Sequence, residues 1–454
     1  MRRGRKRPAK PATPGRRLQA CVEFRPVRRL LARLGLAALV TLAVPGAATG
    51  APAPADPRDR MLNERAVRVG RNTADRHVTP EGLLAYVHRH NATPEQLSAD
   101  ALKLADTGIW SGCYAASLSC RYAITRDPES LALVRRLAAG LDLLSKATGK
   151  EGCLSRAVGR PIPGESPGKD TRRSPLGGGL MFRDDPSRDT LSGVVLGWTM
   201  MARLVDDPEV RATASRNLGA IARRLAKGGM KVRDVDWDVT KHGQLDPKVA
   251  LVVENGVHAA IGCAAILAGQ RYSPGEDLDR AWRRLEKDGW VDSIDSQHTW
   301  IDTQALDASN VQMSHLALVV VALEGTGRAR SNAMRALRDL RRHTKRWQNG
   351  ALLALFLLAG GDYDRADAAE DLRTTLLAMR PEEVEWKGTT RAKQRHIVPI
   401  ERRPVSTWLW KEDADHEEMG YENAVPHPDR TVTRADWLFA YWLGRASGAM
   451  SPGM

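Results

Sequence analysis

Two aspartates stand where long apolar segments begin, and there they could perform acid–base chemistry. Asp106 precedes an apolar segment that starts near Ser111, and Asp189 directly precedes one that starts at Thr190. A glycosidase needs one carboxyl group as acid and a second as base or nucleophile, at a separation that decides the stereochemical outcome. We therefore name Asp106 and Asp189 as candidate catalytic residues. The alternative is that both aspartates cap their helices.

A third carboxylate shares a loop with an aromatic residue and a histidine. In the stretch VRDVDWDVTKHGQ (232–244), Asp236, Trp237 and His242 could supply an acid, a stacking surface and a proton carrier. The alternating acids are similar to a calcium loop, but the Gly and the distal Glu that an EF-hand requires are missing. We expect Asp236 to substitute for one member of the catalytic pair and Trp237 and His242 to bind substrate. The alternative is a plain short hairpin.

Three further side chains are suited to binding sugars. Trp110 offers a flat face for a sugar ring, and an arginine can bind a uronate or sulfate group through two parallel hydrogen bonds. Trp110, Arg156 and Arg188 lie near the same segment starts, so we expect them to bind substrate. The alternatives are that Trp110 packs at the rim and that the arginines form structural ion pairs, Arg188 with Asp184 or Asp185.

Asn255 and His258 are candidates for a different reaction on the same class of substrate. A lyase needs a base, His or Tyr, and a group such as Asn or Arg that neutralises the substrate carboxylate. Glu254 and His258 are four residues apart and share a helix face, so a structural Glu–His bond is the alternative. Metal motifs, phosphate-cradling glycine loops and nucleophile elbows are absent from the sequence, and we expect neither metal nor cofactor.

The elements that must position these residues are helices. Six segments are dense in small and apolar residues, which is typical of helices that are buried all round; they begin near 111, 190, 256, 311, 350 and 436. Amphipathic, charged segments follow five of them, at 128–147, 208–226, 275–288, 328–346 and 364–379. A sixth outer helix is expected at 80–104. Strand signals are scarce, so the pattern predicts an all-α fold of helical hairpins.

The connections give this array an orientation. Turns from apolar to charged segments are short, and two of them place Asp at the N-cap and Pro next, at Asp127–Pro128 and Asp207–Pro208. The return connections are mostly long, at 148–189, 227–255, 289–310 and 380–435. In a closed array of hairpins all long loops meet at one end, and long ordered loops are usually functional. We therefore expect the site at the long-loop end.

These segments resemble the six-hairpin (α/α)-toroid superfamily, which includes glycoside hydrolases and polysaccharide lyases, and more narrowly secreted bacterial six-hairpin proteins. The similarity is carried by 106–130, 152–158, 187–198, 232–244 and 434–445. The resemblance covers about 105–450 and implies an (α/α)6 toroid, which we place over 80–450, that acts on a carbohydrate such as a cell-envelope glycan, with hydrolysis favoured over elimination. It assigns no role to individual residues. The alternative is a non-catalytic toroid of the cell envelope that binds a glycan or a protein.

The basic charge of the chain is concentrated at its beginning. Residues 1–50 hold twelve Lys or Arg and one Glu, which gives +11 of the formal +15 and leaves +4 for the remaining 404 residues. We therefore expect no nucleic-acid partner. Basic clusters, a short apolar run and small residues before Ala51 indicate an export leader, and 51–79 is expected to be a linker or disordered. The alternative is a single N-terminal membrane anchor.

Four cysteines would remain in an exported chain: Cys113, Cys120, Cys153 and Cys263. An oxidising compartment permits disulfides between them, with three possible pairings. Cys113 and Cys120 are too far apart on one predicted helix to pair with each other. The alternative is that all four are small buried residues with free thiols.

Overall fold

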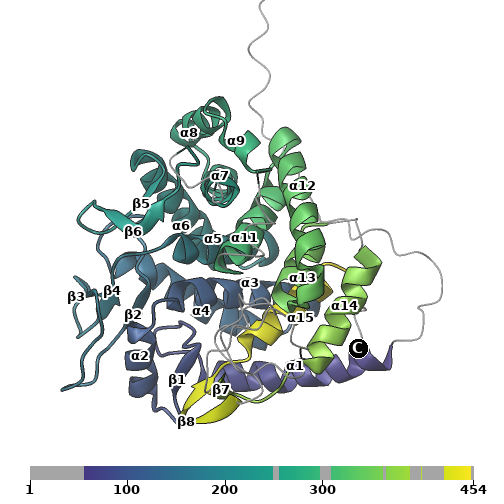
Figure 1. Ribbon diagram of the computed structural model, residues 1–454. Helices are drawn as coiled ribbons and strands as arrows, with labels where there is room; N and C mark the ends of the chain where they lie inside the picture. Colours follow the sequence, from purple (N-terminus) through teal and green to yellow (C-terminus); the bar gives the residue numbers. More distant parts are fainter. Residues whose placement is uncertain are drawn as a thin grey trace, which may run out of the picture. The chain divides into compact units, whose positions relative to one another are not determined.

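A computed structural model places most of the chain (Figure 1). The residues it describes are 56–248, 255–296, 308–360, 365–388, 400 and 424–450. The chain divides into a unit of residues 1–53 and a unit of residues 54–454, and the second is described here. Its described residues are mostly helical, which confirms the all-α class. No helix among them is long and apolar enough to cross a bilayer. The expected leader lies outside the described residues.

Six helices correspond to the six apolar segments, and each begins within four residues of its expected start. They are α3 (Thr107–Thr125), α5 (Arg188–Leu204), α7 (Asn255–Tyr272), α11 (Ala308–Glu324), α13 (Gly350–Leu358) and α15 (Ala435–Ala446). Small and apolar residues cover most of their circumference, so they are buried nearly throughout. Each contacts the next along the chain, α15 contacts α3, and α5 also contacts α11.

Helices α3 and α5 pack with their backbones in contact. A Cβ atom added to Gly112 would lie 2.1 Å from the carbonyl oxygen of Gly193, and one added to Gly193 would lie 2.5 Å from that of Ile109. Near the start of both helices, a Cβ on Gly108 would meet the methyl group of Thr190 at 2.9 Å. Only glycine permits such an approach. The two helices therefore begin side by side at the same end of the fold.

Five outer helices lie within a few residues of their predicted bounds. They are α4 (Pro128–Lys146), α6 (Pro208–Lys227), α8 (Glu276–Lys287), α12 (Gly327–Thr344) and α14 (Arg365–Ala378). The two predicted N-caps are confirmed, because Asp127 accepts from the backbone N–H of Ser130 at 2.7 Å and Asp207 accepts from that of Val210 at 2.9 Å. The short turns thus start outer helices as the sequence indicates.

The prediction of a linker at 51–79 is wrong for most of that stretch. Residues Pro57–Arg76 form helix α1, which contacts α14 and α15. The segment is rich in arginine, which hid a narrow buried stripe made by Leu62, Ala66 and Val69. The outer helix expected at 80–104 is also wrong in its first half, because only Pro94–Lys103 (α2) is helical. The outer position beside α14 and α15 is therefore taken by α1.

Small antiparallel sheets, which the sequence did not predict, form in the long connections at 148–189, 227–255 and 380–435, the last together with β1. Their strands are β1 (Val87–Arg89), β2 (Ala157–Gly159), β3 (Thr171–Arg173), β4 (Met181–Arg183), β5 (Lys231–Arg233), β6 (Val239–Gln244), β7 (Val384–Gly388) and β8 (Ala424–Val432). The strand orders are β1-β8-β7, β2-β4-β3 and β5-β6. Most of these strands are three residues long, too short for an alternating pattern to be recognised. Strand pairing therefore orders the described parts of these connections.

The four cysteines of the described unit are buried and unpaired. This confirms the free-thiol alternative for Cys113, Cys120, Cys153 and Cys263. Burial raises the pKa of each thiol, to about 11 for Cys153. The thiols therefore serve as small apolar groups in the core.

Candidate functional site

Asp106 and Arg156 form the centre of a polar cluster where α3 begins. Asp106 occupies the N-cap position, but its side chain makes no capping hydrogen bond. Its carboxylate instead lies 3.4 Å from a guanidinium nitrogen of Arg156. Arg156 also donates from Nε to the carbonyl oxygen of Ala105 at 2.7 Å, and its own carbonyl accepts from the N–H of Gly108 at 2.8 Å. The side-chain capping alternative for Asp106 is thus wrong, and the structural ion pair expected as the alternative for Arg156 is present.

Tyr86 adds a phenol to this cluster. Burial raises the pKa of the Tyr86 hydroxyl well above its usual range, and the Asp106 carboxylate raises it further. A backbone hydrogen bond from Asp106 and the charges of Arg156 and Arg183 oppose that rise. The sequence did not single out Tyr86, because it lies in the stretch that was expected to be an outer helix. Only the chain's path through β1 brings it to Asp106.

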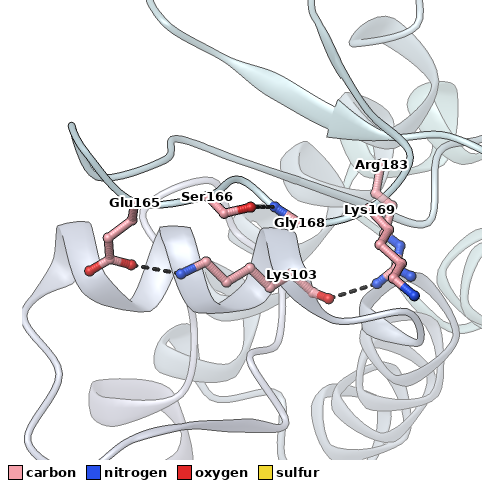
Figure 2. A pocket seen from close by; sticks show the side chains of 6 residues that line it. All are labelled: Lys103, Glu165, Ser166, Gly168, Lys169 and Arg183. Carbon is pink, nitrogen blue, oxygen red and sulfur yellow. Dashed lines mark hydrogen bonds and ion pairs between the residues drawn. The ribbon is translucent and has the colours of Figure 1, made fainter.

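A pocket of about 500 Å³ opens beside this cluster, between α2 and the loop that leads to β3 (Figure 2). It is lined by Lys103, Glu165, Ser166, Gly168, Lys169 and Arg183. Lys103 pairs with Glu165 at 2.6 Å, and Arg183 donates to the carbonyl oxygen of Lys103 at 2.6 Å. The backbone joins the pocket to the cluster, since the carbonyl oxygen of Arg183 accepts from the N–H of Arg156 at 2.8 Å.

Arg188 and His258 connect the starts of α5 and α7. The Arg188 guanidinium contacts the His258 ring, and His258 is only 2 % exposed. Neither of the aspartates proposed as alternative partners pairs with Arg188. Asp184 pairs with Arg172 at 2.9 Å, and Asp185 accepts from the backbone N–H of Lys241 at 3.0 Å. That alternative is wrong, because these aspartates turn toward neighbouring strands.

Asp189 lies in the first turn of α5, but it is not the cap of that helix. Ser187 is the N-cap, and its hydroxyl accepts from the backbone N–H of Thr190 at 3.3 Å. The capping alternative for Asp189 is therefore wrong. Its catalytic role stays a prediction, supported by the contact between the starts of α3 and α5.

Trp110 points into the protein. It is 1 % exposed, and its ring meets the ring of Tyr86 edge-on with centroids 6.5 Å apart. A sugar has no open face of this ring to stack on, so burial favours the packing alternative. The side chains of Asn255 and Glu254 lie outside the described residues, and the lyase role proposed for Asn255 stays a prediction.

The loop with alternating acids forms the hairpin between β5 and β6. The loop therefore has the geometry of the plain short hairpin that was the alternative to a site. Asp234 accepts from the N–H groups of Asp236 and Asp238 at 3.0 and 2.8 Å, so one acid organises the turn. Asp236 is exposed and pairs with Arg172 at 2.6 Å. That pair ties the hairpin tip to β3. The proposed substitution of Asp236 for a catalytic partner stays a prediction.

Trp237 and His242 lie on the exposed side of the same hairpin. Trp237 is 37 % exposed, and the cations of Arg224, Lys227 and Arg233 lie 4.6, 5.5 and 5.5 Å from its ring centroid. These cations occupy the kind of π surface that a sugar would need. His242 is exposed on β6. Neither side chain contacts Asp106 in the part of the chain that the structure describes.

A buried ion pair at the start of α15 was also missed. Arg434 and Asp436 are 1 % and 3 % exposed, and their charged atoms lie 3.3 Å apart. Burial raises the pKa of the Asp436 carboxyl, and the charge of Arg434 opposes that rise. The sequence showed both residues inside RADWLFAYWLGR, but their burial depends on the packing of α15 against α3 and α13.

Within the described ranges, no group of three or more His, Cys, Asp or Glu residues is arranged to hold a metal ion. No family model, curated protein sequence or solved structure matches the chain. The function proposed below therefore rests on the chain's own residues and their arrangement.

Proposed function

We propose that the described unit is an (α/α)6 toroid whose inner ring is α3, α5, α7, α11, α13 and α15. The support is the succession of contacts along these six helices, together with the contact of the last with the first. The outer helices would be α4, α6, α8, α12 and α14, with α1 in the sixth position. Each buried helix then forms a hairpin with an amphipathic partner.

We further propose that the protein is an exported carbohydrate-active enzyme that breaks a glycosidic bond. The observation that carries this proposal is the side-by-side start of α3 and α5, because it puts Asp106 and Asp189 on neighbouring helices at the long-loop end. Two carboxyl groups on facing elements are what hydrolysis of a glycoside requires. Since Arg156 faces Asp106, we assign Asp106 the role of base or nucleophile and Asp189 the role of acid.

The test begins with the mature protein and a panel of polysaccharides, with reducing ends measured as product. For a polysaccharide that is cleaved, Asp106→Asn and Asp189→Asn are each expected to lower kcat by at least about a hundredfold, as is usual when an acid or base is removed. Asp339→Asn is the matched control, since Asp339 lies on outer helix α12 and, among the described residues, pairs only with Arg342, one turn away. Unchanged turnover in both site variants would contradict the catalytic roles assigned to Asp106 and Asp189.

Elimination is a second candidate, favoured by Tyr86 beside Arg156 and Arg183. In a lyase, a protonated tyrosine can give its proton to the leaving oxygen, while arginine neutralises the uronate carboxylate. The products distinguish the two reactions, because elimination leaves an unsaturated sugar that absorbs ultraviolet light and hydrolysis does not. Binding of a polysaccharide with no cleavage of any kind would instead indicate the non-catalytic alternative.

Export is proposed from residues 1–50 alone. Fusion of this segment to a reporter protein that folds only after export tests it directly. Replacing the basic clusters by glutamine in the fusion should abolish export, because the positive residues are an essential part of such leaders. Reporter activity that does not depend on the segment would contradict the proposal.

A further inference from the structure

The pocket beside the Asp106 cluster has an excess of positive charge. Three of its lining residues are cationic, Lys103, Lys169 and Arg183, and one is anionic, Glu165, which gives a net charge of +2. The remaining lining residues, Ser166 and Gly168, offer a hydroxyl and a backbone N–H that bond to each other at 3.3 Å. A ligand that enters this pocket therefore meets mainly hydrogen-bond donors with positive charge.

The single carboxylate does not cancel this charge, because it is already engaged. Glu165 accepts two hydrogen bonds from Arg89, both 3.1 Å long, and pairs with Lys103 at 2.6 Å. The hydrogen bonds from Arg89 and Lys103 lower the pKa of Glu165 to about 2. Glu165 is thus ionised and committed to two cations. Lys169 and Arg183 are left for another partner.

Arg183 is a cation that has no anionic partner among the described residues. Among the described residues, its guanidinium makes a single hydrogen bond, from Nη1 to the carbonyl oxygen of Lys103, and its Nε is buried with no acceptor. No carboxylate lies within ion-pair distance of Arg183 in the described part of the chain. A buried guanidinium nitrogen without an acceptor costs free energy.

The surroundings of Arg183 explain what kind of partner would fit. Burial and the charge of Arg156 lower the pKa of the Arg183 guanidinium, while Asp170, Tyr86 and Asp106 act in the opposite direction. An oxyanion in the pocket would accept from Nη2, the guanidinium nitrogen that is neither bonded nor buried, and would offset the repulsion from Arg156. Lys169 is exposed at the pocket and has no ion-pair partner among the described residues, so it would add a second contact.

We propose that this pocket binds the acidic group of an anionic glycan, a carboxylate or a sulfate, and so holds the chain beside Asp106. The inference rests on the proposed function, which places glycosidic-bond cleavage at Asp106. Two noncovalent contacts connect the two sites, since the backbone N–H of Arg156 donates to the carbonyl oxygen of Arg183 and the Arg156 side chain contacts Asp106. The acid group would therefore anchor a sugar unit near the one that reacts.

Calorimetric titration of the mature protein tests the pocket without requiring catalysis. The probes are an oligogalacturonate, a sulfated dextran oligosaccharide and a neutral maltooligosaccharide of similar length. At low salt we expect at least one anionic probe to bind roughly tenfold or more tightly than the neutral one, with the difference shrinking as salt is added. The anionic probe that binds better identifies the acid group as carboxylate or sulfate.

The variants Lys169→Gln and Arg183→Gln are each expected to weaken binding of the anionic probe by roughly three- to tenfold. Arg280→Gln is the control, because it removes one positive charge from an exposed position on outer helix α8. Lys169 is exposed, so its variant keeps the test decisive if Arg183→Gln does not fold. Equal binding of all three probes, or unchanged binding in Lys169→Gln, overturns the pocket proposal.

The outcomes separate this inference from the proposed function. If anionic probes bind through Lys169 and Arg183 but no glycan is cleaved, the pocket stands and the enzyme assignment fails. If a neutral glycan is cleaved through Asp106 and Asp189 while the pocket variants behave as wild type, the enzyme assignment stands and the pocket proposal fails.

Discussion

Arg156 holds Asp106 at the start of α3. One guanidinium nitrogen lies 3.4 Å from the Asp106 carboxylate, and Nε donates to the preceding carbonyl oxygen, that of Ala105, at 2.7 Å. Both side chains are mostly buried, with 14 % of Arg156 and 24 % of Asp106 exposed. These contacts attach the connection between α4 and α5 to the N-terminus of α3, where a catalytic aspartate is proposed.

Arg156→Gln should therefore destabilise the fold as well as the site. We expect the free energy of unfolding to fall by about 1–3 kcal/mol, because hydrogen bonds to partly buried charged groups are lost. Urea unfolding followed by circular dichroism measures the change. Arg280→Gln removes an exposed pair with Glu276 on one helix and should cost less than about 0.5 kcal/mol. Equal losses in the two variants would contradict a positioning role for Arg156.

Gly112→Ala should disrupt the contact between α3 and α5. The added methyl group would lie 2.1 Å from the carbonyl oxygen of Gly193, so the helices must separate, and we expect a loss of more than about 3 kcal/mol. Gly70→Ala is the matched control in helix α1, because its Cβ would meet nothing closer than 3.7 Å. That variant should be neutral or up to about 1 kcal/mol more stable. A mild effect of Gly112→Ala would mean that the helices are not in backbone contact.

Stability should fall in mild acid because two buried histidines resist protonation. Burial lowers the pKa of His315 to about 4, although a bond to the carbonyl oxygen of Val311 opposes the shift. Burial and the neighbouring charge of His77 lower the pKa of His88 to about 4. The unfolded chain takes up these protons near pH 6.5, so the stabilisation is complete above that pH and is lost as the pH falls toward 4. Each histidine contributes about 3 kcal/mol to the loss.

His315→Asn tests that prediction, since asparagine can keep the bond to Val311 without titrating. The difference in unfolding free energy between pH 7 and pH 4.5 should shrink by about 2–3 kcal/mol relative to the wild type. His343→Asn, at an exposed position on α12, should leave the difference as it is. If the two variants show the same pH dependence, protonation of His315 does not drive the acid sensitivity.

The four buried thiols should be unreactive until the protein unfolds. Cys113, Cys120, Cys153 and Cys263 are at most 1 % exposed and have raised pKa values, so neither access nor thiolate is available. In the mature protein we expect no rapid labelling by a thiol reagent under native conditions and four labels per chain in concentrated urea. Fewer than four labels in urea without reductant would reveal a disulfide and contradict the free-thiol assignment.

The sequence by itself determined the helices and their order. Apolar periodicity predicted the six buried helices and the five outer helices, and N-cap chemistry predicted the caps Asp127 and Asp207. Both signals act between residues that are close in the chain. It also indicated that long connections gather before the buried helices. It missed α1, where arginines surround a narrow apolar stripe, and the three-residue strands, which are too short to show an alternating pattern.

Only the tertiary structure decided which side chains meet. It turned Trp110 into the core, joined Arg156 to Asp106 and Arg188 to His258, and brought Tyr86 to the start of α3. The basic pocket takes its residues from α2, from the loop before β3 and from β4, and no local pattern links those segments. Local rules fix the elements, whereas long-range packing fixes the distances between charges, and chemistry at a site depends on those distances.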